Sequence, residues 1–208
     1  PPPPPPPPPR LDSSAASDVY KRQGLDHAGP VLGGKLVTER GPIQLTRGLP
    51  FPAVTLPATD GSYVSLATLR GRNIVAVYPW TGRPGIANPP CWDDIPGAHG
   101  STPELEGFRE RFELISHAGA RRFAVSGQTT DFQREMALRL ELPFPILSDA
   151  AGALRRALDL PTFEAGPETF LKRLTFVVLD GKVEHVFFPV EDPEAHAAEV
   201  VDWLKSQV

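Results

Sequence analysis

The residues best suited to chemistry lie in the run Gly100-Ser101-Thr102-Pro103, which follows a long loop and opens a predicted helix. Ser101 and Glu104 have the three-residue spacing of a capping box, and Pro103 fits the first helical position, where its missing N–H would be unpaired anyway. The N-terminus of a helix holds anions and favours a thiolate, because its first N–H groups have no helical partner. This run therefore predicts a site for an anion or a nucleophile.

A strand, a loop and a helix are expected to position this site. The β-branched run Asn73–Tyr78 indicates a buried strand that stops at Pro79. The Pro- and Gly-rich loop from Pro79 to Gly100 is long enough to indicate a functional, mobile or inserted segment. The helix predicted over Thr102–Ala118 has an apolar face at helical spacing, made of Leu105, Phe108, Phe112 and Ile115.

Tyr78-Pro79, Gly100-Ser101-Thr102-Pro103 and Phe108-Arg109-Glu110 together resemble the active-site sequence of peroxiredoxins, which are thiol peroxidases. The family motif is Pro-x-x-x-Thr-x-x-Cys, and its cysteine lies in the first turn of a helix and attacks peroxide. The opening Leu56–Asn73 also looks like the start of such chains. The resemblance covers roughly residues 49–208. It implies an α/β, thioredoxin-like fold with a central mixed sheet and helices on both faces, and no cofactor or metal.

The resemblance places Ser101 at the position of the peroxidatic cysteine, and Glu106 where some members carry a resolving cysteine. A second alignment with the motif, without an insertion in the loop, places Ile86 at the position of the peroxidatic cysteine. This alignment loses the match to the helix start and to the pair Phe108-Arg109. A serine hydroxyl cannot be oxidised to a sulfenic acid, so the chain is expected to be impaired or inactive as a peroxidase. A misread cysteine codon at 101 is an open alternative, because one nucleotide change separates the two residues.

Arg173 lies just before a predicted strand, where peroxiredoxin-like chains carry an arginine that hydrogen-bonds the peroxide and stabilises the thiolate. A guanidinium suits this role because it stays charged and presents several fixed donors. The resemblance therefore predicts that Arg173 faces Ser101. The other predicted residues of the substrate pocket are Pro79, Gly100 and Thr102.

Cys91 is the only cysteine in the chain, so an intramolecular disulfide and a cysteine zinc cluster are excluded. It precedes Ser101 by ten residues, a length of chain that can fold back to the site. Asp93 and Asp94 disfavour a thiolate beside them, although Arg173 could offset their charge. An incidental loop cysteine is the favoured interpretation, and a relocated peroxidatic thiol is the alternative.

Two functions follow from these observations. The first is a thiol peroxidase for hydrogen peroxide or organic hydroperoxides, in which Cys91 acts or residue 101 is a cysteine, and an external thiol such as thioredoxin is the reductant. The second is a redox-inactive peroxiredoxin-like protein that acts by binding and shares the family's tendency to form homodimers. The lone cysteine fits a reducing compartment, so a cytoplasmic location is expected.

Other candidate residues have plainer interpretations. His99 near Ser101 suggests a nucleophile with its base, but a solvated loop histidine is the simpler interpretation. His185 lies on an alternating strand and is expected at a surface or rim. Trp80 and Trp92 flank the long loop and are expected to anchor it by packing. Predicted caps for the following helix are Thr129, Thr130 and Asp131.

The remaining sequence predicts one domain with an appended start. The chain has 208 residues and a net charge of −4, which argues against nucleic acid as a partner, and no apolar run approaches the roughly 20 residues of a membrane span. Pro1–Gln23 is a proline homopolymer followed by adapter-like sequence, predicted to be a non-native, disordered segment. Residues 24–48 are predicted to be an extension with one possible strand at 35–37, and residues 49–208 the domain.

The element order within the domain is typical of a thioredoxin-like topology. Asp60-Gly61 and Asp180-Gly181 predict hairpin turns, the second between strands 174–179 and 183–188. Further strands are predicted at 122–126 and 144–147, and helices at 131–140, 152–158 and from the cap Asp192 to Leu204.

Overall fold

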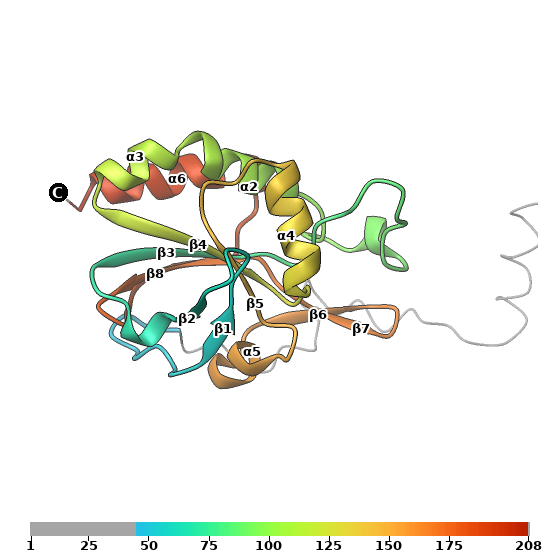
Figure 1. Ribbon diagram of the computed structural model, residues 1–208, viewed down its shortest axis with the longest axis horizontal. Helices are drawn as coiled ribbons and strands as arrows, with labels where there is room; N and C mark the ends of the chain where they lie inside the picture. Colours follow the sequence, from blue (N-terminus) through green and yellow to red (C-terminus); the bar gives the residue numbers. More distant parts are fainter. Residues whose placement is uncertain (1–44, 208) are drawn as a thin grey trace, which may run out of the picture. The chain divides into compact units, whose positions relative to one another are not determined.

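The computed structural model describes residues 45–207, which lie within one compact unit. The segment Pro1–Gln23, the possible strand at 35–37 and most of the extension 24–48 lie outside the described residues. A five-stranded mixed sheet forms the centre of the fold, in the strand order β5-β4-β3-β8-β9 (Figure 1). The strands are β3 (Arg72–Val77), β4 (Ala120–Ser126), β5 (Ile146–Ser148), β8 (Leu174–Leu179) and β9 (Lys182–Phe187).

The central strand β3 organises this sheet. It pairs in parallel with β4 and antiparallel with β8, so its backbone is hydrogen-bonded on both edges. All of its residues after Arg72 are buried, which explains its almost continuous Ile, Val and Ala sequence. The strand ends at Val77, next to the loop that leads to Ser101.

Helices cover both faces of the sheet, as predicted. On one face lie α2 (Ser101–Glu110), α3 (Phe112–His117) and α6 (Pro193–Lys205), and α4 (Thr130–Arg139) adds Met136 to the same apolar layer (Figure 1). The other face is covered by α5 (Ala153–Leu158), the short 3-10 helix η1 (Leu66–Thr68) and the hairpin of β1 (Thr55–Pro57) and β2 (Tyr63–Ser65).

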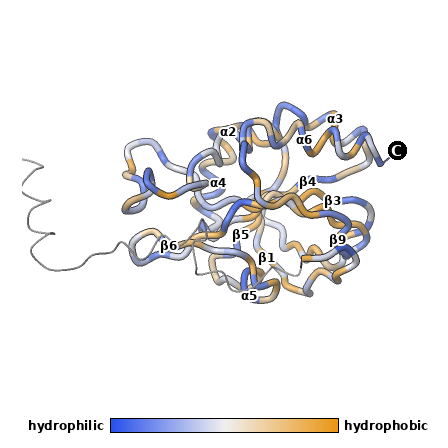
Figure 2. Tube along the Cα trace, turned by 180° about the vertical axis from the view of Figure 1, so that it is seen from behind, coloured by the Kyte–Doolittle hydropathy of each residue, from blue (hydrophilic) through white to orange (hydrophobic). Residues whose placement is uncertain are grey.

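Each face has its own apolar layer, and the orange segments of the sheet in Figure 2 run between the two. Leu105 and Phe108 of α2 pack with Val200 of α6 on one side, and Val75 and Phe176 face the other layer. Burial of one such side chain contributes about 1.5–3 kcal/mol. The layer that contains Leu105 and Phe108 therefore packs α2 against the sheet.

Two features differ from the sequence predictions. The single helix predicted over 102–118 is wrong, because it is divided into α2 and α3 at Arg111, where φ is −99° and ψ is 16°. Arg111 N–H still donates to the carbonyl of Gly107, so the chain bends there rather than leaving the helical path. A hairpin of β6 (Thr162–Ala165) and β7 (Glu168–Leu171) was not predicted, because each strand has only four residues and β7 does not alternate polar and apolar residues.

The structure contains both predicted hairpin turns and the predicted caps at Thr129 and Asp192. Both hairpins, β1–β2 and β8–β9, are present. Thr129 caps α4 by accepting a hydrogen bond from Phe132 N–H, whereas Thr130 and Asp131 are the first two residues of that helix. Asp192 caps α6, because its side-chain oxygen accepts hydrogen bonds from the N–H groups of Glu194 and Ala195. Within residues 45–207, no helix is long and apolar enough to cross a membrane.

The turn between β8 and β9 gives a test of this packing. Gly181 has φ of +75°, and a Cβ there would collide with the carbonyl oxygen of Ala67 in η1. Gly61 has φ of +88°, and a Cβ added there would have no other atom within 4 Å. We expect Gly61→Ala to lower the free energy of unfolding by about 1–2 kcal/mol through backbone strain alone. Gly181→Ala should cost clearly more in urea denaturation, and equal losses would show that η1 does not press on the turn.

Candidate active site

The candidate site lies where β3 ends and α2 begins. Gly100 precedes α2 with φ of 99°, and a Cβ there would lie 2.6 Å from Cγ of Pro193, the first residue of α6. Only glycine therefore allows the chain to turn into α2 this close to α6. Ser101 follows as the first residue of α2, and its side chain is buried.

Arg173 lies between β7 and β8, and its side chain is buried beside the start of α2. Its Nη2 donates to Ser101 Oγ at 3.2 Å and to the carbonyl of His99 at 2.8 Å. Its Nη1 pairs with the carboxylate of Glu104. The structure thus brings together Ser101 and Arg173, whose functional roles stay predictions.

Glu104 is the residue of this site that the sequence analysis placed wrongly. The predicted capping box is absent, because the cap position is Gly100, Ser101 lies inside the helix and Pro103 is its third residue. The Glu104 side chain is fully buried and turns to Arg173 instead. A signal was present: positions 101, 104, 105 and 108 share one helical face, so Glu104 lies on the buried stripe.

The pair of Glu104 and Arg173 is electrostatically unusual. Burial raises the pKa of Glu104 to about 7, although the positive charge of Arg173 opposes this shift. Glu104 Oε1 and Arg173 Nε have no hydrogen-bond partner among the described residues. Buried polar atoms of this kind usually bind water or a ligand. Glu104 Oε1 could still accept one hydrogen bond, and Arg173 Nε could still donate one.

An aromatic cluster holds the long loop against the β6–β7 hairpin. Trp92 lies 5.4 Å from Trp80, 4.9 Å from Phe170 of β7 and 5.7 Å from Phe163 of β6, measured between ring centroids. Thr81 adds hydrogen bonds from its N–H and hydroxyl to the side-chain oxygen of Gln128. The predicted anchoring by Trp80 and Trp92 is confirmed. The loop is thereby held so that the His99 carbonyl reaches Arg173.

The side chains of Cys91 and His99 lie apart from the contact between Ser101 and Arg173. Cys91 is exposed, at the start of the 3-10 helix η2 (Trp92–Asp94), whereas Ser101 and Arg173 are buried. The His99 ring is also exposed and pairs with Asp93 at 2.8 Å, so it is not hydrogen-bonded to Ser101 as a base.

His185, predicted at a surface or rim, is half-buried and stacks on Trp203, with ring centroids 5.0 Å apart. Pro79 is buried and Thr102 is half-buried, and their part in a substrate pocket stays a prediction. Among residues 45–207, no group of three or more His, Cys, Asp or Glu side chains is arranged to hold a metal ion.

The fold and the site together define a peroxiredoxin-like α/β protein, and comparison with known proteins identifies the family. The family model described as Redoxin matches residues 46–202, and the chain belongs to the Redoxin family. It is 28% identical over 165 residues to chloroplastic peroxiredoxin Q of Oryza sativa subsp. japonica, an alignment that covers 78% of this chain and 68% of the rice protein.

Solved structures show the same fold. The peroxidoxin BcpB of Mycobacterium tuberculosis superposes with a TM-score of 0.63 at 23% identity, over 78% of this chain and 97% of that one. A cysteine-to-serine mutant of Xanthomonas campestris peroxiredoxin Q gives a TM-score of 0.62 at 24% identity, over 78% and 99% of the two chains. The expected α/β, thioredoxin-like fold with a central mixed sheet is confirmed.

The raised pKa of Glu104 predicts how stability depends on pH. Between the ordinary pKa of glutamate, near 4.5, and about 7, the folded chain retains a proton that the unfolded chain releases. The free energy of unfolding should therefore fall as pH rises through this window. Glu104→Gln removes the titrating group. As pH rises from 4.5 to about 7, the free energy of unfolding of the parent, relative to that of this variant, should decrease by up to about 3 kcal/mol.

Urea denaturation at several pH values measures this difference. The control is Glu110→Gln at the exposed end of the same helix, whose stability difference from the parent should stay nearly constant with pH. If the parent instead gains stability over Glu104→Gln as pH rises, the attraction of Arg173 outweighs burial and the assigned direction is wrong.

Proposed function

We propose that this chain retains the substrate pocket of a thiol peroxidase but lacks its reacting sulfur, so that it binds peroxides at Ser101 without reducing them. The observation that carries the proposal is the 3.2 Å hydrogen bond from the buried Arg173 to Ser101 Oγ at the start of α2. An arginine directed at this position is placed to stabilise a thiolate or to donate to a peroxide oxygen. The peroxiredoxin names of the relatives suggest hydrogen peroxide or an organic hydroperoxide as the ligand.

The chemistry of oxygen and sulfur explains why the activity should be lost. In thiol peroxidases a thiolate attacks one peroxide oxygen, the O–O bond breaks, and the departing oxygen takes up a proton and leaves as water or an alcohol. The sulfur is oxidised to a sulfenic acid. A serine hydroxyl has no corresponding oxidised state, so Ser101 can bind the peroxide through hydrogen bonds but cannot reduce it.

The alternative is a peroxidase that uses Cys91. That thiol lies on the aromatic-anchored loop, but it is exposed, whereas the donors of Arg173 are directed to Ser101, Glu104 and the His99 carbonyl. We therefore favour the Ser101 pocket as the site. A thiolate restored at 101 would need an external thiol such as thioredoxin for turnover, since Glu106 is not a cysteine. A cytoplasmic location and a homodimer belong to the same proposal.

Restoring the sulfur tests this proposal. The full chain, Cys91→Ser and the double variant Ser101→Cys/Cys91→Ser are reduced, mixed with limiting hydrogen peroxide and followed by peroxide consumption in a single turnover. The double variant should react more than about tenfold faster than the parent, because Arg173 favours the thiolate, whereas an ordinary cysteine is only a few per cent ionised at neutral pH. Mass spectrometry should show one added oxygen atom on residue 101.

The parent provides the matched control, because its exposed thiol, Cys91, lies in the same fold but outside the contact between Ser101 and Arg173. If the double variant consumes peroxide no faster than the parent, the pocket does not support thiol chemistry and the proposal fails. Rapid consumption by the parent that disappears in Cys91→Ser would instead identify Cys91 as the peroxidatic residue.

A further inference from the structure

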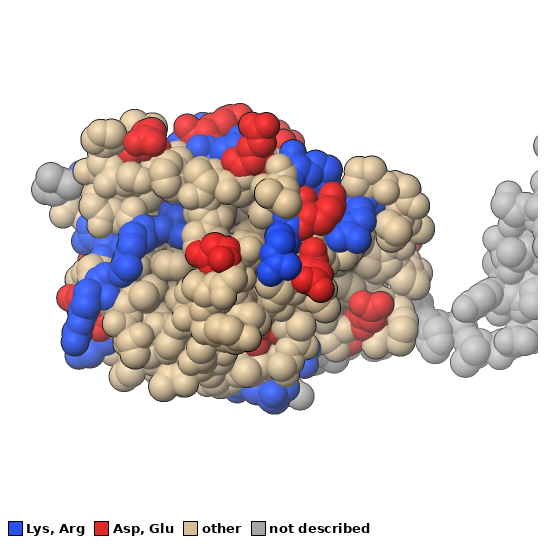
Figure 3. All heavy atoms as spheres, viewed as in Figure 1, with Lys and Arg blue, Asp and Glu red and all other residues tan. Residues whose placement is uncertain are grey.

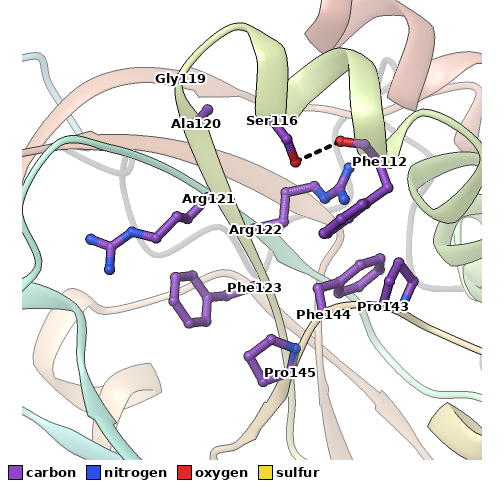
Figure 4. A pocket seen from close by; sticks show the side chains of 10 residues that line it. All are labelled: Phe112, Ser116, Gly119, Ala120, Arg121, Arg122, Phe123, Pro143, Phe144 and Pro145. Atoms are coloured by element: carbon purple, nitrogen blue, oxygen red, sulfur yellow. Dashed lines mark hydrogen bonds between the residues drawn. The ribbon is translucent and has the colours of Figure 1, made fainter.

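A pocket of about 540 Å³ lies between α3, the first residues of β4 and the segment Pro143–Pro145 (Figure 4). Its apolar walls include the rings of Phe112, Phe123 and Phe144. Its volume falls in the range of pockets that hold small organic molecules. It is built at the beginning of β4, and none of the residues at the Ser101 site lines it.

Arg122 is the unusual residue of this pocket. Its side chain is only 5% exposed, and its guanidinium carbon lies 4.3 Å from the ring centroid of Phe112 and 5.0 Å from that of Phe144. Nη1 donates to the carbonyl of Phe108 at 2.9 Å. Nε and Nη2 have no hydrogen-bond partner among the described residues. The aromatic rings cover the guanidinium group, and two of its donors are left unused.

The charge of Arg122 is not neutralised by a close carboxylate. Burial lowers the pKa of Arg122 to about 10, partly offset by the negative charge of Glu113, so the guanidinium stays protonated at neutral pH. Glu113 is exposed, and no salt bridge joins it to Arg122 among the described residues. A buried cation with unused donors is costly unless an anion pairs with it.

We propose that this pocket binds an organic carboxylate with an apolar body, with the carboxylate on Nε and Nη2 of Arg122. Adjacent guanidinium nitrogens match the two oxygens of a carboxylate, and the apolar walls match an aliphatic or aromatic body. Nε and Nη2 are buried in this structure, so binding requires a displacement of the half-buried ring of Phe112. This site is independent of the proposed peroxide site.

The surrounding charge favours the approach of an anion. Arg121 lies on the same strand, is exposed and lines the same pocket. Figure 3 shows a strip of Lys and Arg side chains below α3, over the region where β4 begins in Figure 1. Inorganic phosphate would share this attraction but would gain nothing from the apolar walls. A monocarboxylate loses less hydration on entering the pocket and also buries its body.

Octanoate is a suitable probe, with octan-1-ol as its uncharged counterpart and inorganic phosphate as an anion without an apolar body. Isothermal titration calorimetry on the full chain should detect octanoate binding that is at least about tenfold tighter than binding of either control, since a charge-assisted hydrogen bond adds this much. Arg122→Met, which keeps an unbranched apolar stem and loses the guanidinium and its charge, should weaken octanoate binding by about tenfold or more. Arg134→Met, at an exposed arginine of α4 that does not line this pocket, is the matched control and should change it less than about threefold.

A direct measurement avoids reliance on the folding of Arg122→Met. In the ¹⁵N spectrum of the parent chain, the Nε–H signal of Arg122, assigned by its loss in Arg122→Lys, should shift as octanoate is added. The proposal is overturned if that signal does not move, if octan-1-ol or phosphate binds as tightly as octanoate, or if Arg134→Met weakens binding as much as Arg122→Met.

Discussion

The buried ion pair between Glu104 and Arg173 is the interaction on which the site depends. It joins α2 to the entry of β8, two elements 69 residues apart in the chain. Two charges withdrawn from water are stable together only when further hydrogen bonds satisfy them. Arg173 donates to Ser101 and to the His99 carbonyl, whereas Glu104 Oε1 has no further partner among the described residues, in line with its raised pKa. Loss of one partner from such a pair typically costs about 3–5 kcal/mol, so the pair holds the loop, the helix and the strand together.

This arrangement explains how serine can occupy position 101 without disturbing the fold. The contacts there require only a small side chain that accepts a hydrogen bond from Arg173, and a serine hydroxyl meets that requirement. The glycine before it is more tightly constrained, because a side chain at Gly100 would meet Pro193. The shape of the site therefore tolerates oxygen in place of sulfur, whereas the chemistry of peroxide reduction does not.

The sequence patterns predicted the five strands of the central sheet, the caps at Thr129 and Asp192 and both short turns, because each depends on residues close together in the chain. The relation between Ser101 and Arg173 followed from resemblance to a family and from no local pattern. Glu104 was placed in a capping box because the local spacing fits one, but its partner lies far along the chain and burial changed its role. The β6–β7 hairpin was missed because tertiary packing against Trp92, rather than an alternating pattern, stabilises it.

The two buried arginines differ in how their charge is compensated. Arg173 has a carboxylate, a hydroxyl and a carbonyl, and only Nε lacks a partner among the described residues. Arg122 has one carbonyl and two aromatic faces, whose attraction for a cation is weaker than that of a carboxylate. The carbonyl belongs to Phe108 on α2, the same helix that begins at Ser101. The first turn of α2 therefore contacts Arg173, whose charge is paired with a carboxylate, and its last turns contact Arg122, whose charge is not. An anion is the missing partner of Arg122.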